Sequence, residues 1–415
     1  MQTRENLAPW ERIASEGGDV KSFEVAVAEW ARAMVAEAWQ RFVERVEERI
    51  ERENAPALRR KGLEERTLWT EFGPVKIMRQ RYYYADGREK KSFIGFDKRV
   101  DLAPRVHAAP AFAEDLAGLA SIAPSYESSS GIVKLLLGDG PCARTIWKLA
   151  QKEGERLRRQ DTEERRSVFR DGELPGFDAP AKEFVGVEAD STMIHSWKRR
   201  GENHEAFLGI VYDGKEKVGR KRRRLRNKVA ACGLQGAKQF GQDLFVAAQK
   251  NHNVVDANLT LYGSDGAACL ETIRLEHFPA APHQLDWHHV TEKIRQAYGW
   301  DLIDDAKKVM ELVFSEDRDG FEQQTVFDRR RLPRRRSKID ELREYVLPRW
   351  DWLFSYREMK RRHEEMPEHL NGTGGIERNV GTVVGHRMKW RGMGWTKRGG
   401  ANILRIRLKT LGLQN

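Results

Sequence analysis

The sequence predicts an α/β protein that contains a mixed β-sheet covered by helices. Apolar segments, polar turns and amphipathic stretches follow one another between residues 184 and 286 in the order β-β-β-α-β-α-β. This order is typical of three antiparallel strands followed by parallel strands with helical crossovers. The chain has 415 residues, 40% of them hydrophobic. It is therefore long enough for about two to three domains with cores of their own.

The first predicted element is a long amphipathic helix over residues 21–53. Apolar side chains from Phe23 to Ile50 recur every three to four residues, and Asn54-Ala55-Pro56 ends the helix. We expect this helix to pack within its own domain, and the alternative is a coiled coil that forms a dimer. Residues 1–64 are assigned to this N-terminal helical segment.

A small antiparallel β unit is predicted over residues 65–107. The alternating stretches Thr67–Phe72 and Val75–Tyr84 are separated by Gly73-Pro74, and Asp86-Gly87 supplies a second turn.

Residues 108–177 are predicted to form a helical DNA-binding domain with a helix-turn-helix. Helices are expected over 109–121, 125–137 and roughly 142–160, and Gly138-Asp139-Gly140 forms the turn before the third. Basic side chains on that third helix suit contact with DNA. An ordinary helical hairpin is the alternative. The expected DNA-binding residues here are Arg144, Lys148 and Lys152.

A further domain is assigned to residues 178–290 and 371–415, after a linker at Asp178-Ala179-Pro180. Residues 288–368 are helical by period and rich in charge, and residues 291–370 are assigned to a helical insertion. The expected core strands are Phe184–Asp190, Ala206–Tyr212, Val229–Ala231, one ending at Asp265 and one at 282–286, with a helix near 236–250.

The charge distribution indicates a polyanionic partner. The formal net charge is +11, and nine of the fourteen residues from Lys215 to Lys228 are Lys or Arg. A second basic run covers Arg329–Arg336. Such density favours binding to phosphate, although a solvated loop is the alternative for each run. The expected DNA contacts in these runs are Arg220, Arg222, Arg223, Arg224, Arg226, Arg334 and Arg335.

Other sequence features favour a soluble cytoplasmic protein. Cys142, Cys232 and Cys269 are far apart and form no paired motif, which argues against a disulfide framework or a structural zinc site. No apolar stretch approaches the ~20 residues of a membrane-spanning helix, and the N-terminus lacks the apolar segment of a signal peptide.

Three acidic residues from distant segments are the candidate catalytic groups. Asp190 and Asp265 each end a predicted buried strand, and Glu377 opens the basic C-terminal helix. Neighbouring strands hold such carboxylates rigidly about one strand spacing apart. Converging carboxylates can hold two Mg²⁺ ions, with Mn²⁺ as a substitute, and such ions catalyse phosphodiester chemistry. Each residue also has a structural alternative as a turn or cap residue, and Glu188 is a rival to Asp190.

Four motifs carry a resemblance to a known family. They are Val187-Glu188-Ala189-Asp190, Gly263-Ser264-Asp265-Gly266-Ala267, Leu285-Asp286-Trp287-His288-His289, and the stretch from Gly375-Ile376-Glu377-Arg378 to Trp395. The chain resembles a DDE-type transposase of bacterial insertion sequences, closest to the ISLre-type group and similar to the Mutator-like group. The resemblance covers residues 180–410 well and the N-terminal part more loosely.

The resemblance implies that residues 178–290 and 371–415 form an RNase H-like catalytic core in which Asp190, Asp265 and Glu377 bind the metals. It assigns Asp286 and His289 to a supporting D-x-x-H element, and a structural role for His289 or its neighbour His288 stays open. The basic tail adds Arg387 and Lys389 as DNA contacts. Two departures from the family pattern are Ser191-Thr192 after the first aspartate and Arg378 after the glutamate.

The function expected from the resemblance is Mg²⁺-dependent cleavage of element ends and strand transfer to target DNA. A homodimer or higher oligomer on DNA is expected because the reaction joins two ends, and a nucleoid-associated bacterial protein is implied. The alternatives are an RNase H-like metal nuclease without joining activity and a transposase-derived DNA-binding protein without catalysis.

Overall fold

The computed structural model describes residues 11, 13, 17–87, 91–102, 107–176, 181–198, 201–220, 222–354, 356–367, 370, 373–389 and 393–414. The chain divides into two compact units, Met1–Ala150 and Gln151–Asn415. The division falls inside a helix rather than at residue 177, where the sequence suggested a boundary. The expected linker at 178–180 lies outside the described residues.

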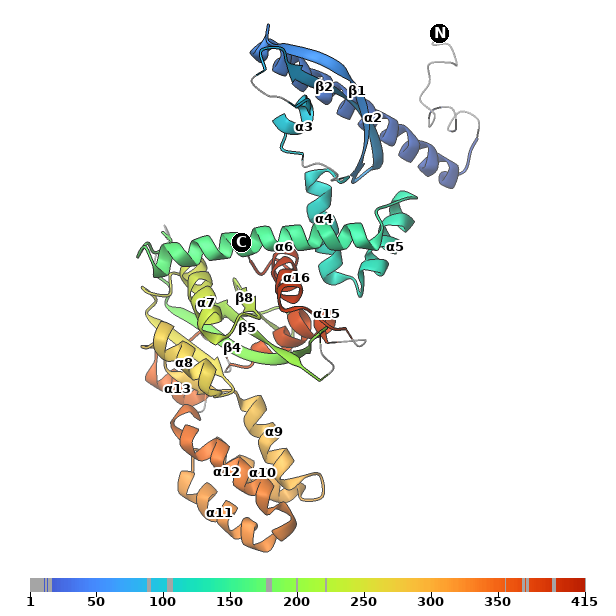
Figure 1. The fold of residues 1–415 in the computed structure, drawn as a ribbon. Helices are drawn as coiled ribbons and strands as arrows, with labels where there is room; N and C mark the ends of the chain where they lie inside the picture. The colour runs from blue at the N-terminus through green and yellow to red at the C-terminus, as the bar shows by residue number, and fades with distance from the viewer. Residues whose placement is uncertain are drawn as a thin grey trace. The chain divides into compact units, whose positions relative to one another are not determined.

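The first unit begins with a long helix that packs on a three-stranded antiparallel sheet (Figure 1). Asp19 caps the helix by accepting a hydrogen bond from Ser22 N at 2.7 Å. Val43 of the helix is buried against Leu68 and Ile77 of the sheet, so packing within its own domain is confirmed. The elements are α2 (Val20–Asn54), β1 (Leu58–Thr70), β2 (Gly73–Tyr84), β3 (Phe93–Ile94) and α3 (Gly95–Arg99).

The first strand of this sheet begins earlier than predicted. β1 starts at Leu58, inside the range assigned to the N-terminal helical segment. Its residues from Arg59 to Glu64 are mostly polar, so they show no apolar alternation, but they pair with β2 as far as Tyr83. The hairpin partner, rather than the local pattern, therefore determines the start of this strand.

The predicted helical region is present as α4 (Pro110–Ile122), α5 (Tyr126–Leu137) and α6 (Ala143–Phe169). Ser125 caps α5, and Gly138 ends it with a left-handed φ of 79°. α6 extends nine residues beyond the expected end at residue 160. Within the second unit, Asp161 of α6 accepts a hydrogen bond from Arg405 at 2.6 Å. Such tertiary contacts explain the extension, because they support helix that the local sequence alone does not predict.

The second unit is built on a five-stranded mixed sheet with the strand order β10-β9-β4-β5-β8. β4 pairs antiparallel with β5 and parallel with β9, and β9 pairs parallel with β10. The predicted element order is thereby confirmed as an α/β arrangement. The strands are β4 (Phe184–His195), β5 (Asn203–Tyr212), β8 (Val229–Gly233), β9 (Leu259–Ser264) and β10 (His283–Leu285).

Alternation along β4 assigns its side chains to two different layers. Val185, Val187 and Ala189 are buried with residues of α7 (Ala237–His252) and α8 (Ala268–His277). Glu188 and Asp190 therefore point to the opposite face. On that side, β4 contacts α14 (Ile376–Asn379) and the π-helical turn η4 (Val380–Gly385). The chain continues through α15 (His386–Met388) to α16 (Lys397–Thr410), which contacts β8.

A charged hairpin absent from the sequence prediction lies between β5 and β8. It consists of β6 (Lys215–Lys217) and β7 (Arg223–Leu225), which pair antiparallel. Strand patterns are read from apolar residues, and this hairpin contains mostly basic ones.

The helical insertion is present and has a core of its own, in which Val309, Phe321 and Leu342 are buried. Its first helix starts at Trp287, one residue before the expected helical stretch and directly after β10, and α10 to α12 form a bundle beyond it (Figure 1). The elements are α9 (Trp287–Tyr298), α10 (Ile303–Phe314), α11 (Arg318–Arg331), η2 (Pro333–Arg335), α12 (Arg336–Val346), η3 (Leu347–Trp352) and α13 (Tyr356–Arg362).

Candidate metal centre

Three aspartates occupy neighbouring register positions in or directly after three adjacent strands. Glu188 of β4 pairs with Gly263 of β9, and Leu285 of β10 pairs with Ser264 of β9. Continuing these registers by one or two residues brings Asp190, Asp265 and Asp286 side by side. β4 itself runs on to His195, so Asp190 does not end its strand as predicted. Asp190 instead lies where the pairing between β4 and β9 stops.

The closest cluster of metal-binding groups comprises Asp190, His289 and Glu377. One ligand atom from each lies within 4.8 Å of the others. Asp190 comes from β4, His289 from the first turn of α9, and Glu377 from α14. The three segments are distant in sequence, and the sheet and its helical cover bring them together.

Asp265 is not a member of this cluster, contrary to the expected set. Its carboxylate Oδ1 accepts a hydrogen bond from Ala267 N at 2.8 Å, which turns the side chain toward its own loop. Tyr345 of the insertion donates to the backbone oxygen of Asp265 at 2.7 Å and anchors the same loop. The third member of the cluster is His289, which the sequence assigned to a supporting role.

The charges of the site interact across short distances. The pKa of Asp190 is raised to about 6, chiefly by burial and also by the neighbouring carboxylates of Glu377 and Asp265. The hydrogen bond from Ser191 N, at 2.7 Å, and the His289 ring act in the opposite direction. A cation would stabilise the charged form of Asp190, which burial and the neighbouring carboxylates disfavour.

The His289 ring suits metal ligation. Nε2 lies 2.7 Å from Glu377 Oε1. This buried nitrogen nevertheless makes no aligned hydrogen bond among the described residues, so the short distance is an electrostatic contact. An imidazole nitrogen beside two carboxylates fits a divalent transition-metal ion such as Mn²⁺, whereas Mg²⁺ prefers oxygen ligands throughout. The residues present therefore fit one divalent cation, with Asp265 close by as a further oxygen donor.

Glu188, the rival to Asp190, has a structural role, because its carboxylate is hydrogen-bonded to the protein itself. Its buried carboxylate accepts hydrogen bonds from Tyr212 Oη at 2.7 Å, Gly374 N at 3.0 Å and Ile376 N at 2.9 Å. These bonds tie the loop that leads into Glu377 to the central strand. Burial raises the pKa of Glu188. Gly374 has a left-handed φ of 113°, which favours glycine in this loop.

Asp286 acts as the cap of α9, because its Oδ1 accepts from His288 N at 2.9 Å. Its Oδ2 is buried without a hydrogen-bond partner among the described residues. A Cβ atom on Gly374 would lie 3.9 Å from Asp286 Oδ1, so this aspartate borders the same loop as Glu188. Of the two adjacent histidines, His289 is the one whose ring nitrogen lies next to the Glu377 carboxylate, so it is the candidate ligand.

A relay of three side chains behind the site was not predicted. Ser264 Oγ lies 2.8 Å from His283 Nε2, and His283 Nδ1 lies 2.9 Å from Glu271 Oε2, although not aligned for a hydrogen bond. Ser264 and His283 are buried, so this serine is inaccessible to a substrate. The relay connects β9, β10 and α8 next to Asp265. No motif spacing in the sequence signals it.

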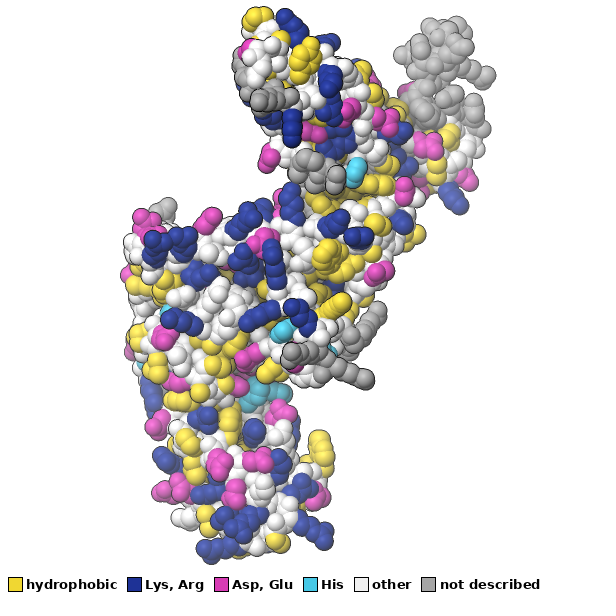
Figure 2. All heavy atoms as spheres, viewed as in Figure 1, with side chains coloured by type: hydrophobic (Ala, Val, Ile, Leu, Met, Phe, Trp, Pro, Cys, Tyr) yellow, Lys and Arg dark blue, Asp and Glu magenta, His cyan; other side chains and the backbone are white. Residues whose placement is uncertain are grey.

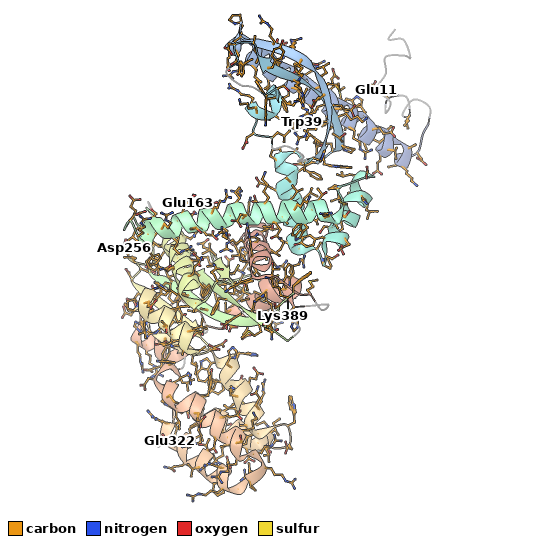
Figure 3. All side chains as sticks on the ribbon, viewed as in Figure 1. Glu11, Trp39, Glu163, Asp256, Glu322 and Lys389 are labelled. Atoms are coloured by element: carbon orange, nitrogen blue, oxygen red, sulfur yellow. The ribbon has the colours of Figure 1, made fainter. Side chains whose placement is uncertain are left out.

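The predicted DNA-binding residues differ in their surroundings. Arg387 is 2% exposed and stacks on Trp395 with 4.8 Å between guanidinium and ring, so it belongs to the core rather than to an accessible surface. Arg335 pairs with Asp301 at 2.8 Å. Lys389, labelled in Figure 3, contacts the Thr192 hydroxyl of β4. The exposed ones are Arg144, Lys148, Lys152, Arg220, Arg222, Arg223, Arg224, Arg226 and Arg334.

Basic side chains are prominent on the surface of α6. Lys152, Arg158 and Arg159 are exposed there, where Lys and Arg side chains gather in the space-filling view (Figure 2). Arg158 also pairs with Glu155. Across the part of the chain described above, no helix is both long and apolar enough to cross a membrane.

Comparison with known proteins assigns the chain to a family. The model of an uncharacterised protein family, UPF0236, matches residues 13–412. The chain belongs to the UPF0236 family. It is 22% identical over 356 residues to a protein of Streptococcus gallolyticus described as "UPF0236 protein in vanSb 3'region", covering 82% of this chain and 72% of that protein. The match extends through both compact units, so the N-terminal region and the metal-centre region belong to one family architecture.

Proposed function

We propose that this UPF0236 protein is a DNA transposase with an RNase H-like core, which cleaves element ends and joins them to target DNA. The observation that carries the proposal is the convergence of Asp190, Glu377 and His289 on the face of a mixed sheet. Asp265 lies at the end of the neighbouring parallel strand. The strand order and the helical insertion between β10 and α14 support the same reading.

Asp190, Glu377 and His289 would hold a divalent cation, with Asp265 as an additional oxygen ligand. Bound there, the cation would polarise the scissile phosphate and lower the pKa of an attacking water. The donors favour Mn²⁺, and Mg²⁺ would rely on the carboxylates. Surrounding groups fix these ligands: Ser191 N holds Asp190, Ala267 N holds Asp265, and Glu188 holds the loop before Glu377.

The proposed reaction has two displacement steps at phosphorus. A water oxygen attacks the phosphorus at the element end, the P–O3′ bond breaks, and the freed 3′ oxygen takes up a proton. That 3′-OH then attacks a phosphodiester of the target, a new P–O3′ bond forms, and the target strand leaves with a free 3′-OH. Neither step needs a serine or tyrosine nucleophile.

The test is a strand-transfer assay with end-labelled DNA taken from the regions that flank the gene, in Mg²⁺ or Mn²⁺. We expect joined products from the wild type. Asp190→Asn and Glu377→Gln should lower the rate at least 100-fold, because each removes a metal ligand. Asp304→Asn is the matched control, since Asp304 has a 91% exposed side chain far from the cluster in sequence.

The products separate the alternatives. Nicked DNA that is never joined would support a metal nuclease without transfer activity. DNA binding without any cleavage in either metal would support a binding protein derived from a transposase. Full joining activity in Asp190→Asn would refute the assignment of the site.

A further inference from the structure

A groove borders the segment that carries Glu377. It encloses about 1110 Å³ between the β6–β7 hairpin, residues 373–382 and residues 411–413. Its lining is strongly basic, and among the described residues that line it Glu216 alone is acidic. The cationic lining consists of Lys215, Arg222, Arg223, Arg224, Arg226, Lys228 and Arg378.

Some of these cations are held by internal partners. Arg224 pairs with Glu216 at 2.6 Å and Arg226 pairs with Asp213 at 2.8 Å. Lys228 donates to Asn379 Oδ1 at 2.7 Å. The first two contacts hold the hairpin and its base together, and the third joins Lys228, just beyond the hairpin, to the segment that follows Glu377.

Three arginines in the groove have no such partner. Arg222, Arg223 and Arg378 are exposed, and no carboxylate of the described ranges pairs with any of them. An arginine guanidinium presents a planar set of donors that matches phosphate oxygens. These three side chains are therefore available to an anionic ligand.

The lysines of the groove are crowded by other cations. Burial lowers the pKa of Lys228, and the charge of Arg378 lowers it further. Burial also lowers the pKa of Lys215, where the charge of Arg223 acts in the same direction and that of Glu188 opposes it. Like charges held at close range disfavour each other, and an anion between them relieves the repulsion.

The groove lining also defines the class of anion. Its apolar members are the aliphatic residues Val218, Leu225, Leu411 and Leu413, and the described lining includes no aromatic ring on which a base could stack. Proteins that read unpaired bases rely on such rings. A row of cations without them suits a chain of phosphates, which carries charge but little sequence information.

The groove and the metal centre share one short segment. Thr373, Gly374 and Gly375 form part of the groove wall, and Gly374 N is bonded to Glu188 on the sheet. Glu377 belongs to the metal cluster, whereas the next residue, Arg378, lines the groove. A phosphate chain in the groove would therefore lie one residue along the helix from a metal ligand.

We propose that this groove binds the sugar-phosphate backbone of DNA without reading its sequence and delivers the strand to the metal centre. The choice of DNA rests on the proposed function, whereas the backbone site itself depends only on the groove. Arg378, which departs from the pattern of the transposase family, would contact a phosphate in this groove.

The experiment measures binding of fluorescent 30-base-pair duplexes of two unrelated sequences by anisotropy, without divalent metal, over a range of salt concentrations. The groove variant is the full chain with Arg222→Gln and Arg223→Gln. We expect equal weakening for both sequences, and a slope of log K against log salt that is smaller by about 1.8, since each phosphate contact contributes about 0.9. The charge-matched control is Arg361→Gln with Arg362→Gln, which are exposed and pair with Glu358.

A slope unchanged from wild type, or an equal change in the control, would overturn the groove as a backbone site. A change for only one duplex would overturn sequence-independent binding. Both variants should melt like the wild type, because all four arginines are exposed. A single-stranded RNA competitor that displaces the duplex at a lower concentration than DNA does would overturn DNA as the ligand.

The two proposals can fail separately. If the groove variant binds weakly but the wild type never joins DNA, the groove stands and the transposase assignment falls. If the wild type joins DNA and the groove variant keeps its salt slope, the transposase assignment stands and the groove falls.

Discussion

Glu188 and Asp190 lie two residues apart on β4 and point to the same face of the sheet, but their carboxylates have different surroundings. Asp190 faces His289 and Glu377, whereas Glu188 accepts three hydrogen bonds from Tyr212, Gly374 and Ile376. Because the Glu188 carboxylate already accepts hydrogen bonds from the protein, its role is to hold the loop before Glu377 on β4. Asp190 keeps one oxygen for a ligand.

We predict that Glu188→Gln keeps strand-transfer activity within about tenfold, whereas Asp190→Asn loses it. The glutamine oxygen can accept from the two backbone N–H groups, and its amide can donate to the Tyr212 oxygen. Burial raises the pKa of Glu188, so a neutral side chain also removes a desolvation cost. Complete loss of activity in Glu188→Gln, in a protein that still melts cooperatively, would make Glu188 a metal ligand instead.

Truncation at the same position gives a stability prediction. Glu188→Ala leaves two buried donors, Tyr212 Oη and Ile376 N, and the part-buried Gly374 N without an acceptor. Each buried donor left unpaired costs about 1 to 3 kcal/mol, so we expect the free energy of unfolding in urea to fall by about 2 kcal/mol or more. A loss below about 1 kcal/mol would show that the loop before Glu377 is held by other contacts.

At the level of elements, the strands that carry the aspartates are connected by the Ser264–His283–Glu271 relay. Burial lowers the pKa of His283 to about 4, while the Glu271 carboxylate acts against that shift. His283 is therefore neutral at pH 7, when its Nε2 can accept from the Ser264 hydroxyl. Protonation would remove that acceptor and disturb the ends of β9 and β10.

This histidine gives the protein a defined dependence of stability on pH. The His283 side chain has its usual pKa of 6.5 in the unfolded chain and a pKa of about 4 in the folded protein. The stabilisation is therefore complete above pH 6.5 and is lost as the pH falls toward 4. The full shift corresponds to about 3 kcal/mol.

The measurement is urea unfolding at pH 7.5 and pH 5. We expect wild type to be more stable at pH 7.5, with a smaller difference between the two pH values in His283→Gln. His252 and His277 also have pKa values lowered by burial, so part of the difference should remain. An identical pH difference in the variant would mean that His283 titrates normally in the folded protein.

For the whole molecule, the order of strands and helices along the second unit followed from local sequence, because apolar strands, polar turns and crossover helices have distinct patterns. Asp190 and Asp265 could be selected in the same way, since both follow buried apolar stretches. The extent of β4 could not, because its apolar pattern stops at Asp190 while pairing with β5 continues to His195.

The membership of the site depended on contacts between distant segments. The first turn of α9 brings His289 to Glu377, while Ala267 N draws Asp265 to its own loop. The β6–β7 hairpin was missed because its residues are charged, yet it forms a wall of the basic groove. Side-chain direction and strand pairing between remote segments are properties of the folded chain, and no local pattern records them.

The central claim is that Asp190, His289 and Glu377 form a metal centre. Its most direct test is to measure Mn²⁺ binding to the purified protein by calorimetric titration at pH 7.5. Wild type should bind Mn²⁺, and Asp190→Asn, His289→Ala and Glu377→Gln should each weaken binding at least tenfold, while Asp304→Asn binds like the wild type. Mn²⁺ affinity that is the same in all four variants and in wild type would contradict a metal centre at Asp190, His289 and Glu377.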